Sequence, residues 1–453
     1  MLFTENVFLP SRLRFTSKIA NNTLGQIELL DSSEAVGIEG YKFRGVKGWV
    51  IHRKSGDRIL VVPKPTAVNP YGSVLLVPGI TRVPYKDNDG TQKARWLYPK
   101  VRTITDIDEL VSISQKARES WANAFSFKSE ERNGDEIIKP GMRVPQLGAL
   151  YASLAHWIVT SEIGTVVMPT GTGKTETMLA LLACERPKCL FVVVPTSALR
   201  DQICKKFLTF GVLRKSGVIN SEVDLPVVGK VEHQFNNSDD AIQFLRSCNV
   251  AIATMAVVGG CSEEVQRAIA SECSHVFIDE AHHVSANTWN SFRELFHEQK
   301  KPVLQFTATP FRRDGKHLGG KSIFTYPLRK AQEEKYFTPI TFVSIWEYNR
   351  DTADLAIAKR GIQALEEDIK AGHDHILMAR ADNIERAKQI YSIYSALAPE
   401  FNPLIVHSNL PANEQTNAID KLRSRQSRVI VCVDMLGEGF DLPQLKIAAL
   451  HDI

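Results

Sequence analysis

Short apolar runs separated by helical patterns dominate the chain after residue 142. The runs are "TVVMP", "CLFVVVP", "NVAIAT", "HVFIDE" and "VLQFTAT". Strands that alternate with helices in this way form a parallel sheet covered on both faces by helices. After "YPLRKAQEEKYF" the pattern restarts with "ITFVSIW", "HILMAR", "PLIVHS", "RVIVCVD" and "LKIAAL". The sequence therefore predicts two tandem α/β units with a boundary near Tyr336.

The region before residue 128 has a different pattern. Runs such as "GWVIH", "RILVVP" and "SVLLVP" are separated by Gly, Pro and Asn, which predicts short strands. The stretch "TDIDELVSISQKARESWANAF" predicts a helix capped at Thr105 or Asp106. We interpret the charged stretch "KSEERNGDEIIKPG" as a linker. Residues 1–135 are thus assigned to a β-rich N-terminal accessory domain with a terminal helix, 136–335 to a first lobe and 336–453 to a second.

Composition narrows the class of protein only slightly. The 453 residues are 43% hydrophobic and 23% charged, which is typical of globular domains, and the net charge of +4 favours no class of partner. The seven cysteines are scattered without a CxxC pair, which argues against a disulfide framework and against a zinc or iron–sulfur site. No apolar run approaches the length of a membrane span, and the first residues lack the layout of a signal peptide. We expect a soluble, cytoplasmic protein.

A glycine-rich loop follows the first strand of the parallel pattern. "TVVMP" leads into "TGTGKTETMLALLA", where Gly171 and Gly173 let several backbone N–H groups point at phosphate oxygens. Lys174 can reach the β- and γ-phosphates, and the Thr175 hydroxyl can ligate Mg²⁺. The first glycine of the usual pattern is replaced by Met168, outside the tight part of the loop. The alternative is a glycine-rich helix start with a solvated lysine. The residues predicted to hold ATP are Thr170, Gly171, Thr172, Gly173, Lys174, Thr175 and Glu176.

Two carboxylates stand at the end of a later strand. "HVFIDEAHH" places Asp279 and Glu280 at the carboxyl end of an apolar run, the edge where α/β sheets bind ligands. Asp279 suits Mg²⁺ held through water, and Glu280 suits the activation of an attacking water. Alone, the pair could be an ordinary acidic helix start, but the phosphate loop upstream favours catalysis. Lys174, Asp279 and Glu280 are the predicted catalytic residues.

These motifs together resemble a known family. "MPTGTGKT", "DEAH" and "TATP" resemble motifs I, II and III of superfamily 2 DEAH-type helicases and translocases, and "FTATPFRRDG" leans toward the XPB-like and type III restriction branch, which works on duplex DNA. The resemblance covers about two-thirds of the chain. It implies two RecA-like parallel-sheet lobes, with the second incomplete. It also implies ATP and Mg²⁺ as cofactors and nucleic acid as partner, DNA being favoured over RNA. Whether the N-terminal domain binds a protein partner is left open.

The resemblance assigns further residues in the first lobe. "RVPQ" resembles the adenine-reading Q element and implies a base contact by Gln146, the alternative being a cap for the next helix. "VPTSALRDQ" is similar to motif Ia and "IATM" to the next strand-gripping motif, the alternative again being helix capping. The "TATP" threonines would couple the phosphate site to the nucleic-acid path. The residues implied are Thr196, Ser197, Arg200 and Thr254 for nucleic acid, and Thr307 and Thr309 for coupling.

In the second lobe, "ILMARADNIERAKQIY" stands in the place of motif IV with Arg380 past a strand. "VCVDMLGEGFDLP" resembles motif V and implies that Gly439 and Asp441 contact the nucleotide, with Glu438 assisting. Motif VI of relatives, Gln-x-x-Gly-Arg-x-x-Arg, is not found in the sequence. Its arginines stabilise phosphoryl transfer by roughly 10³–10⁵ in rate. We therefore expect a fragment, truncated before motif VI, that binds ATP–Mg²⁺ and hydrolyses it poorly.

The predicted function is an ATP-dependent nucleic-acid motor, either a DNA helicase or a duplex translocase, that couples hydrolysis to movement along a strand. Whether the strands separate is not decided by the sequence. The alternative from another class is an ATP-gated nucleic-acid clamp or switch that recruits a partner. An unrelated P-loop kinase is disfavoured by "DEAH", "TATP" and the second lobe.

Overall fold

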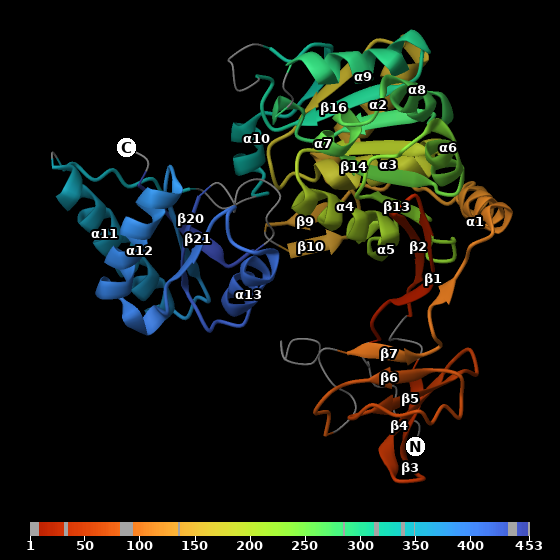
Figure 1. Ribbon diagram of the computed structural model, residues 1–453, viewed down its shortest axis with the longest axis horizontal. Helices are drawn as coiled ribbons and strands as arrows, with labels where there is room; N and C mark the ends of the chain where they lie inside the picture. The colour runs from red at the N-terminus through yellow and green to blue at the C-terminus, as the bar shows by residue number, and fades with distance from the viewer. Residues whose placement is uncertain are drawn as a thin grey trace. The chain divides into compact units, whose positions relative to one another are not determined.

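The chain divides into two compact units, Met1–Pro339 and Ile340–Ile453, a division that lies close to Tyr336. Within the residues that the structure describes, no helix has both the length and the apolar character needed to cross a membrane. The computed structural model (Figure 1) describes residues 9–30, 35–81, 94–134, 136–283, 286–311, 317–336, 340–347, 349–433 and 442–451.

A ten-stranded sheet forms the centre of the first unit (Figure 1). Seven neighbouring strands, from β17 to β13, run parallel, which confirms the predicted α/β class. β2 then pairs antiparallel with β13, β1 pairs antiparallel with β2, and β8 pairs parallel with β1. In sheet order the strands are β17 (Lys321–Thr325), β11 (Gly164–Val167), β16 (Val303–Thr307), β15 (His275–Ile278), β12 (Leu190–Val194), β14 (Val250–Thr254), β13 (Val228–Val231), β2 (Asn22–Glu28), β1 (Arg12–Ile19) and β8 (Arg102–Thr103).

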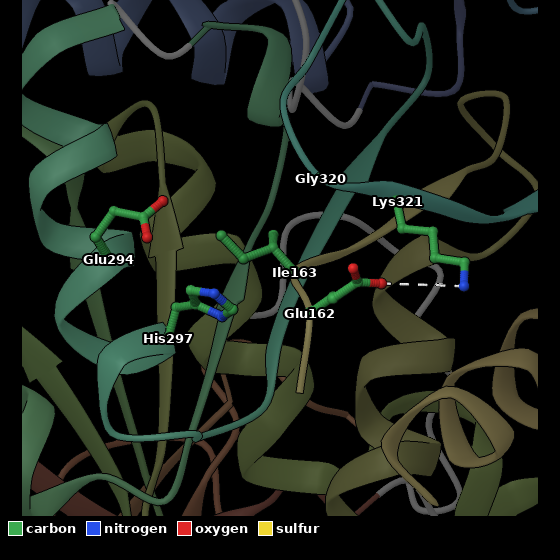
Figure 2. A pocket seen from close by; sticks show the side chains of 6 residues that line it. All are labelled: Glu162, Ile163, Glu294, His297, Gly320 and Lys321. Atoms are coloured by element: carbon green, nitrogen blue, oxygen red, sulfur yellow. Dashed lines mark ion pairs between the residues drawn. The ribbon is translucent and has the colours of Figure 1, made fainter. Parts of the chain in front are cut away.

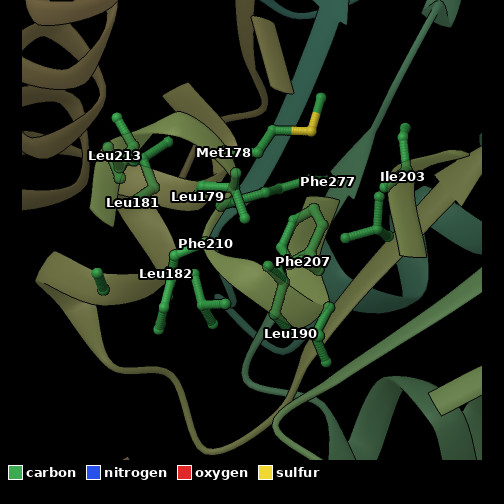
Figure 3. Close-up of a cluster of buried hydrophobic side chains, with 14 of the residues drawn as sticks. Met178, Leu179, Leu181, Leu182, Leu190, Ile203, Phe207, Phe210, Leu213 and Phe277 are labelled. Carbon is green, nitrogen blue, oxygen red and sulfur yellow. The ribbon is translucent and has the colours of Figure 1, made fainter. Parts of the chain in front are cut away.

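Helices cover both faces of this sheet. Val192 and Val194 of β12 face one buried cluster, which Figure 3 shows in part, whereas Phe191 and Val193 face the other. Because successive side chains of a strand point to opposite faces, a strand between two helical layers must be apolar at every position. The helices are α1 (Ile107–Ser120), α2 (Val144–Val159), α3 (Lys174–Glu185), α4 (Ser197–Thr209), α5 (Gly211–Lys215), α6 (Ser238–Arg246), α7 (Met255–Gly259), α8 (Glu263–Glu272), α9 (Ala286–Glu298) and α10 (Leu328–Glu333).

Three strands from the first 135 residues, β1, β2 and β8, belong to the large sheet, and the assignment of residues 1–135 to an accessory domain stays a prediction. Leu24 of β2 and Phe15 of β1 belong to the buried core of the large sheet, together with Val231 of β13. The Asn22 side chain fixes this junction, because its Oδ1 accepts hydrogen bonds from the backbone N–H groups of Glu232 (2.7 Å) and of the next residue. A separate five-stranded sheet contains β3 (Ala35–Phe43), β4 (Val46–Arg53), β5 (Arg58–Val62), β6 (Val74–Leu76) and β7 (Arg95–Tyr98) in that order.

The stretch interpreted as a linker is a hairpin, which corrects that interpretation. β9 (Glu131–Asn133) and β10 (Glu136–Lys139) pair antiparallel. Gly134 between them has a φ of +60°, a left-handed conformation that glycine adopts freely and that tight hairpins require. The Asn-Gly pair was a hairpin signal that the high charge of the stretch concealed.

The second unit contains a smaller parallel sheet in the order β19 (Leu404–Val406), β20 (Val429–Cys432), β18 (Ile376–Arg380) and β21 (Leu445–Leu450). Helices α11 (Arg350–Lys370), α12 (Ile384–Leu397) and α13 (Ala412–Arg423) accompany it. Four of the five predicted strands are therefore present. The fifth, "ITFVSIW", is not a strand: residues 340–346 have no regular secondary structure, and Trp346 is exposed. An apolar run predicts a strand only where a neighbouring strand is free to pair with it.

His275, the first residue of β15, makes the first unit sensitive to acid. Its ring contacts Trp157 edge-on with 5.2 Å between centroids, and burial lowers the pKa of His275 from 6.5 to about 4. Because the folded pKa lies below the unfolded one, the stability that the neutral ring contributes is complete above pH 6.5. It is lost as the pH falls toward 4, where the unfolded chain binds the proton more readily.

We therefore expect the unfolding free energy of the first unit to fall by about 2–3 kcal/mol between pH 7 and pH 4 through this histidine alone. His275→Phe keeps an aromatic ring against Trp157 and cannot titrate, so its stability should fall less. Denaturant titration of both proteins at the two pH values measures the difference. Equal losses in the two proteins would contradict this assignment.

Candidate nucleotide-binding site

The loop between β11 and α3 has the backbone geometry of an anion-binding site. Gly171 and Gly173 have φ values of +85° and +101°, and Gly173 is the N-terminal cap of α3. A Cβ atom on Gly173 would lie 2.0 Å from the Nε2 atom of Gln146, so that side chain would have to move, and the φ of +101° would strain any residue with a side chain. The Thr172 hydroxyl donates to the Pro169 carbonyl at 2.6 Å and closes the turn. A loop that opens into the N-terminus of a helix directs backbone N–H groups toward bound phosphate.

The two predicted carboxylates meet this loop. Asp279 follows β15 directly, and its N–H donates to the Val193 carbonyl at 2.8 Å, which continues the sheet by one residue. Lys174 Nζ donates to Glu280 Oε1 at 2.5 Å. Lys174, Asp279 and Glu280 are only 7%, 3% and 5% exposed. The structure therefore brings the three predicted catalytic residues to one buried place at the carboxyl edge of the sheet.

Glu280 has an unusual backbone. Its φ of +46° lies in the left-handed region, which is uncommon for a residue with a side chain. Its N–H donates to Asp279 Oδ1 at 3.0 Å, and its carboxylate is held by Lys174. Such conformations cost on the order of 1–3 kcal/mol and concentrate at functional sites. Here the turn directs the Glu280 side chain toward the phosphate loop.

The electrostatics of the carboxylates suit a bound cation. The pKa of Asp279 is raised from 3.8 to about 7, mainly by burial and also by the Glu280 charge, while the Lys174 charge lowers it. Glu280 Oε2 is buried and accepts no hydrogen bond from the described residues, although His282 Nδ1 lies 3.6 Å away. An orphaned carboxylate oxygen beside a phosphate loop fits a hydrated Mg²⁺ and an attacking water. Within the described residues, no three His, Cys, Asp or Glu side chains group as direct metal ligands.

A hydrogen-bonded chain connects this site to the next strand. His282 Nδ1 and Thr307 Oγ1 are 3.0 Å apart. The Thr307 hydroxyl also contacts the Thr309 backbone, with Oγ1 to the Thr309 carbonyl at 2.7 Å and the Thr309 N–H to Oγ1 at 3.2 Å. Thr307 and Thr309 were predicted from the sequence, whereas no role was predicted for His282. The position of His282, two residues after Glu280 in the sequence, was the only indication that it would join this series of hydrogen bonds.

Gln146 lies against the phosphate loop and also caps its helix. Its Oε1 accepts a hydrogen bond from the Arg143 N–H at 2.9 Å, which is the capping alternative considered from the sequence. Arg143, which the sequence analysis did not single out, donates from Nη1 to the Gly171 carbonyl at 3.0 Å. The two residues therefore brace the loop, and the adenine contact of Gln146 stays a prediction.

The predicted nucleic-acid residues lie at the carboxyl ends of neighbouring strands. Thr196 follows β12 and caps α4 through Leu199 N–H at 3.2 Å, with Thr196 and Ser197 both exposed. Thr254 ends β14 and caps α7, as the capping alternative stated. Arg200 is buried and its Nη1 donates to the Val231 carbonyl at 3.1 Å, so its guanidinium already supports the fold. Nucleic-acid contact by these residues stays a prediction.

Other predicted residues are placed less closely or not at all. Thr170 is exposed, and Thr175 is half-buried in the first turn of α3. The neighbouring Glu176 is bound to Lys206 Nζ at 3.0 Å. Gly439, Asp441 and Glu438 lie outside the described residues, as do residues 312 and 313.

A cavity of about 570 Å³ lies at the opposite end of the sheet (Figure 2). Its lining includes Ile163, which precedes β11, and Lys321, which opens β17, and Glu162 pairs with Lys321 at 4.0 Å. The phosphate loop follows the carboxyl end of β11, so this cavity is separate from the predicted catalytic residues.

A phosphate loop joined to strand-end carboxylates at the carboxyl edge of a parallel sheet defines a P-loop nucleotide-binding class of protein. Two family models match the chain. The model described as type III restriction enzyme, res subunit, matches residues 139–312, and the helicase conserved C-terminal domain matches residues 361–453. The chain belongs to the superfamily 2 helicases.

Curated relatives include viral, archaeal and yeast proteins. A 51.5 kDa protein of Lactococcus phage (isolate 7-9) is 22% identical over 62% of this chain and 57% of that protein. The DNA 3'-5' translocase XPB2 of Sulfurisphaera tokodaii is 22% identical over 63% of this chain and 70% of the relative. The ATP-dependent RNA helicase DBP8 of Lodderomyces elongisporus is also 22% identical, over 63% and 64%. The chain thus spans less than two thirds of the length of the phage and yeast relatives. The DNA translocase and the RNA helicase are both 22% identical to the chain, so sequence identity does not indicate whether it acts on DNA or on RNA.

Proposed function

We propose that this chain is an ATP-dependent nucleic-acid motor that hydrolyses ATP at the site of Lys174, Asp279 and Glu280. The observation that carries the proposal is the meeting of Lys174 Nζ with Glu280 Oε1 at 2.5 Å, beside Asp279 and at the N-terminus of α3. Lys174 is more than a hundred positions from Asp279 and Glu280 in the sequence, and the proximity of the three side chains supports a site for phosphoryl transfer.

Each residue takes a separate role in this proposal. The N–H groups of the Gly171–Gly173 loop and Lys174 hold the phosphates, whereas Thr175 and Asp279 hold Mg²⁺, Asp279 through water. Bound ATP–Mg²⁺ supplies the phosphoanhydride bond whose cleavage drives the motor. Glu280 accepts a proton from water. Because Lys174 and Glu280 neutralise each other in the present structure, phosphate binding by Lys174 also releases the Glu280 carboxylate for its own task.

We further propose DNA as the preferred track, an assignment supported by the branch-specific "FTATPFRRDG" stretch and by the archaeal translocase among the relatives. Phosphate release should be measured with duplex DNA, single-stranded DNA and RNA at equal nucleotide concentration. Stimulation by DNA above RNA is expected, with marked salt dependence because the grip is on the backbone. Stimulation by RNA alone would contradict the DNA assignment, and ATP-dependent binding without stimulated release would indicate a clamp. Strand-displacement and triplex-displacement assays then separate a helicase from a translocase.

The contact of Thr307 with His282 predicts a specific defect in coupling. Thr307→Val removes the hydroxyl that bonds both His282 and Thr309, while the phosphate loop and carboxylates keep their own contacts. Basal hydrolysis should change by less than about 2-fold, and stimulation by nucleic acid should fall by about 10-fold, the effect of about one lost hydrogen bond to a charged or polar partner.

The matched control is Thr165→Val, because Thr165 is also a buried threonine in the neighbouring strand β11 and its hydroxyl accepts from Gln305 at 3.0 Å. This control should keep its stimulation. Equal basal and stimulated losses in Thr307→Val would show that the hydroxyl serves the phosphate site or the fold alone.

A further inference from the structure

The five-stranded sheet β3–β7 is strongly basic, although the whole chain is nearly neutral. Its described residues, 35–81 and 94–101, contain nine Lys and Arg but only two Asp and Glu. Since the net charge of the chain is +4, the rest of the chain is net negative. The basic residues are Lys42, Arg44, Lys47, Arg53, Lys54, Arg58, Lys64, Arg95 and Lys100.

The two acidic residues of this sheet do not neutralise most of that charge. Glu39 Oε1 lies 3.0 Å from His52 Nε2, and Asp57 lies 4.0 Å from Arg53. The remaining lysines and arginines therefore create a positive local potential, which attracts polyanions.

One face of the same sheet is lined by aromatic rings. Tyr41, Tyr71 and Tyr98 are half-buried against a small apolar cluster that contains Leu60. The rings of Tyr41 and Tyr71 are in edge contact, with 6.4 Å between centroids. Phe43 lies two residues after Tyr41 on β3, so strand alternation places it on the same face, and it is 51% exposed. The tryptophans Trp49 and Trp96 pack against the cluster on the opposite face.

Basic side chains lie beside these rings. Arg44 Cζ is 5.2 Å from the Phe43 ring centroid, Arg58 Cζ is 5.5 Å from that of Tyr71, and Lys100 Nζ is 5.1 Å from that of Tyr98. The aromatic–basic face is defined here by these three pairs. Each pair offers a flat ring and a cation within about 5.5 Å of each other.

We propose that the aromatic–basic face is a second nucleic-acid site, specific for single strands. Rings on a positively charged surface stack with unpaired bases while the cations contact phosphates, and this combination is how single strands are bound without sequence preference. A duplex offers its phosphates but not its base faces, so it would use the cations alone. The site goes beyond the proposed ATPase, and it would hold a strand independently of the nucleotide state.

The test uses the full chain without nucleotide and a short fluorescent oligothymidylate, with affinity measured by anisotropy over a range of salt. Phe43→Ala, Arg44→Ala and Lys100→Ala are combined, because all three side chains are exposed. Affinity should fall about 10- to 100-fold, from one lost stacking platform and two lost cations. The slope of log K against log salt should become shallower by about 1.4.

The matched control combines Lys54→Ala and Lys64→Ala, which remove two charges from exposed positions of the same sheet region. It should keep most of the affinity. An equal loss in this control, an unchanged affinity in the triple variant, or an equal loss for duplex DNA would overturn the proposal. Basal hydrolysis of ATP should be the same in all proteins, so this proposal and the proposed ATPase fail separately.

A second measurement does not depend on the variants. Photocrosslinking of the unaltered chain to 4-thiothymidine-containing oligonucleotides should label peptides that carry Phe43, Tyr71 or Tyr98. Labelling confined to peptides from the large sheet and its helices would overturn the assignment.

Discussion

Glu280→Gln should bind ATP and leave it uncleaved, with turnover lowered by about 10²–10⁴-fold. An amide keeps the shape of the side chain but cannot accept a proton from water. In the unaltered protein Glu280 Oε1 accepts a hydrogen bond from Lys174 Nζ at 2.5 Å, so the Glu280 carboxylate competes with phosphate for Lys174. The neutral amide of the variant removes this ionic competition. The affinity for ATP should therefore be equal to or higher than that of the unaltered protein. Single-turnover phosphate release and equilibrium titration with a fluorescent ATP analogue measure the two quantities separately.

Glu272→Gln provides the control for this prediction. Glu272 accepts a hydrogen bond from Arg246 at 2.8 Å and lies in the last turn of α8, which precedes β15, away from the carboxyl edge of the sheet. Its replacement should change neither ATP affinity nor turnover. If Glu280→Gln instead lost ATP binding and kept turnover of the bound fraction, the assigned roles of Glu280 and the phosphate loop would be reversed.

The parallel sheet could be predicted because its strands are visible as apolar runs in the local sequence. β12 and β14 are buried at every position, and each was visible as an apolar run. The positions of β1 and β2 could not be predicted in the same way. β2 pairs with β13, about two hundred residues later, and the pattern of a strand does not specify a partner that far along the chain.

In the candidate site, too, features with a local sequence pattern could be predicted, whereas features set by tertiary contacts could not. Glycines, a lysine and strand-end carboxylates follow spacing rules, so Gly173, Lys174 and Asp279 could be found in the sequence. Arg143 reaches the Gly171 carbonyl only because α2 packs beside α3, a tertiary contact without a sequence signal. The basic sheet was concealed for another reason. Composition over the whole chain averages its charge against a net negative remainder, and only the sheet boundaries show which residues to count together.

Lys174→Ala should remove ATP binding and also destabilise the first unit. Lys174 is the cation that neutralises Glu280, and its charge lowers the pKa of Asp279. Without it, two adjacent carboxylates remain in a buried place, so the pKa of Asp279 should rise further. Breaking a buried ion pair by removing one partner costs about 3–5 kcal/mol, and the lost phosphate contact should weaken ATP binding by about 10²-fold or more.

Lys206→Ala separates these effects from the ordinary loss of an ion pair. Lys206 pairs with Glu176 at 3.0 Å, but its side chain is 34% exposed, so its removal should cost only about 0–1 kcal/mol. Denaturant unfolding and ATP titration of both variants give the comparison. Because the destabilisation of Lys174→Ala comes from uncompensated carboxylates, it should be partly recovered in the double variant with Glu280→Gln, whereas ATP binding should not return. Recovery of both would mean that Lys174 serves the fold and that the phosphates are held elsewhere.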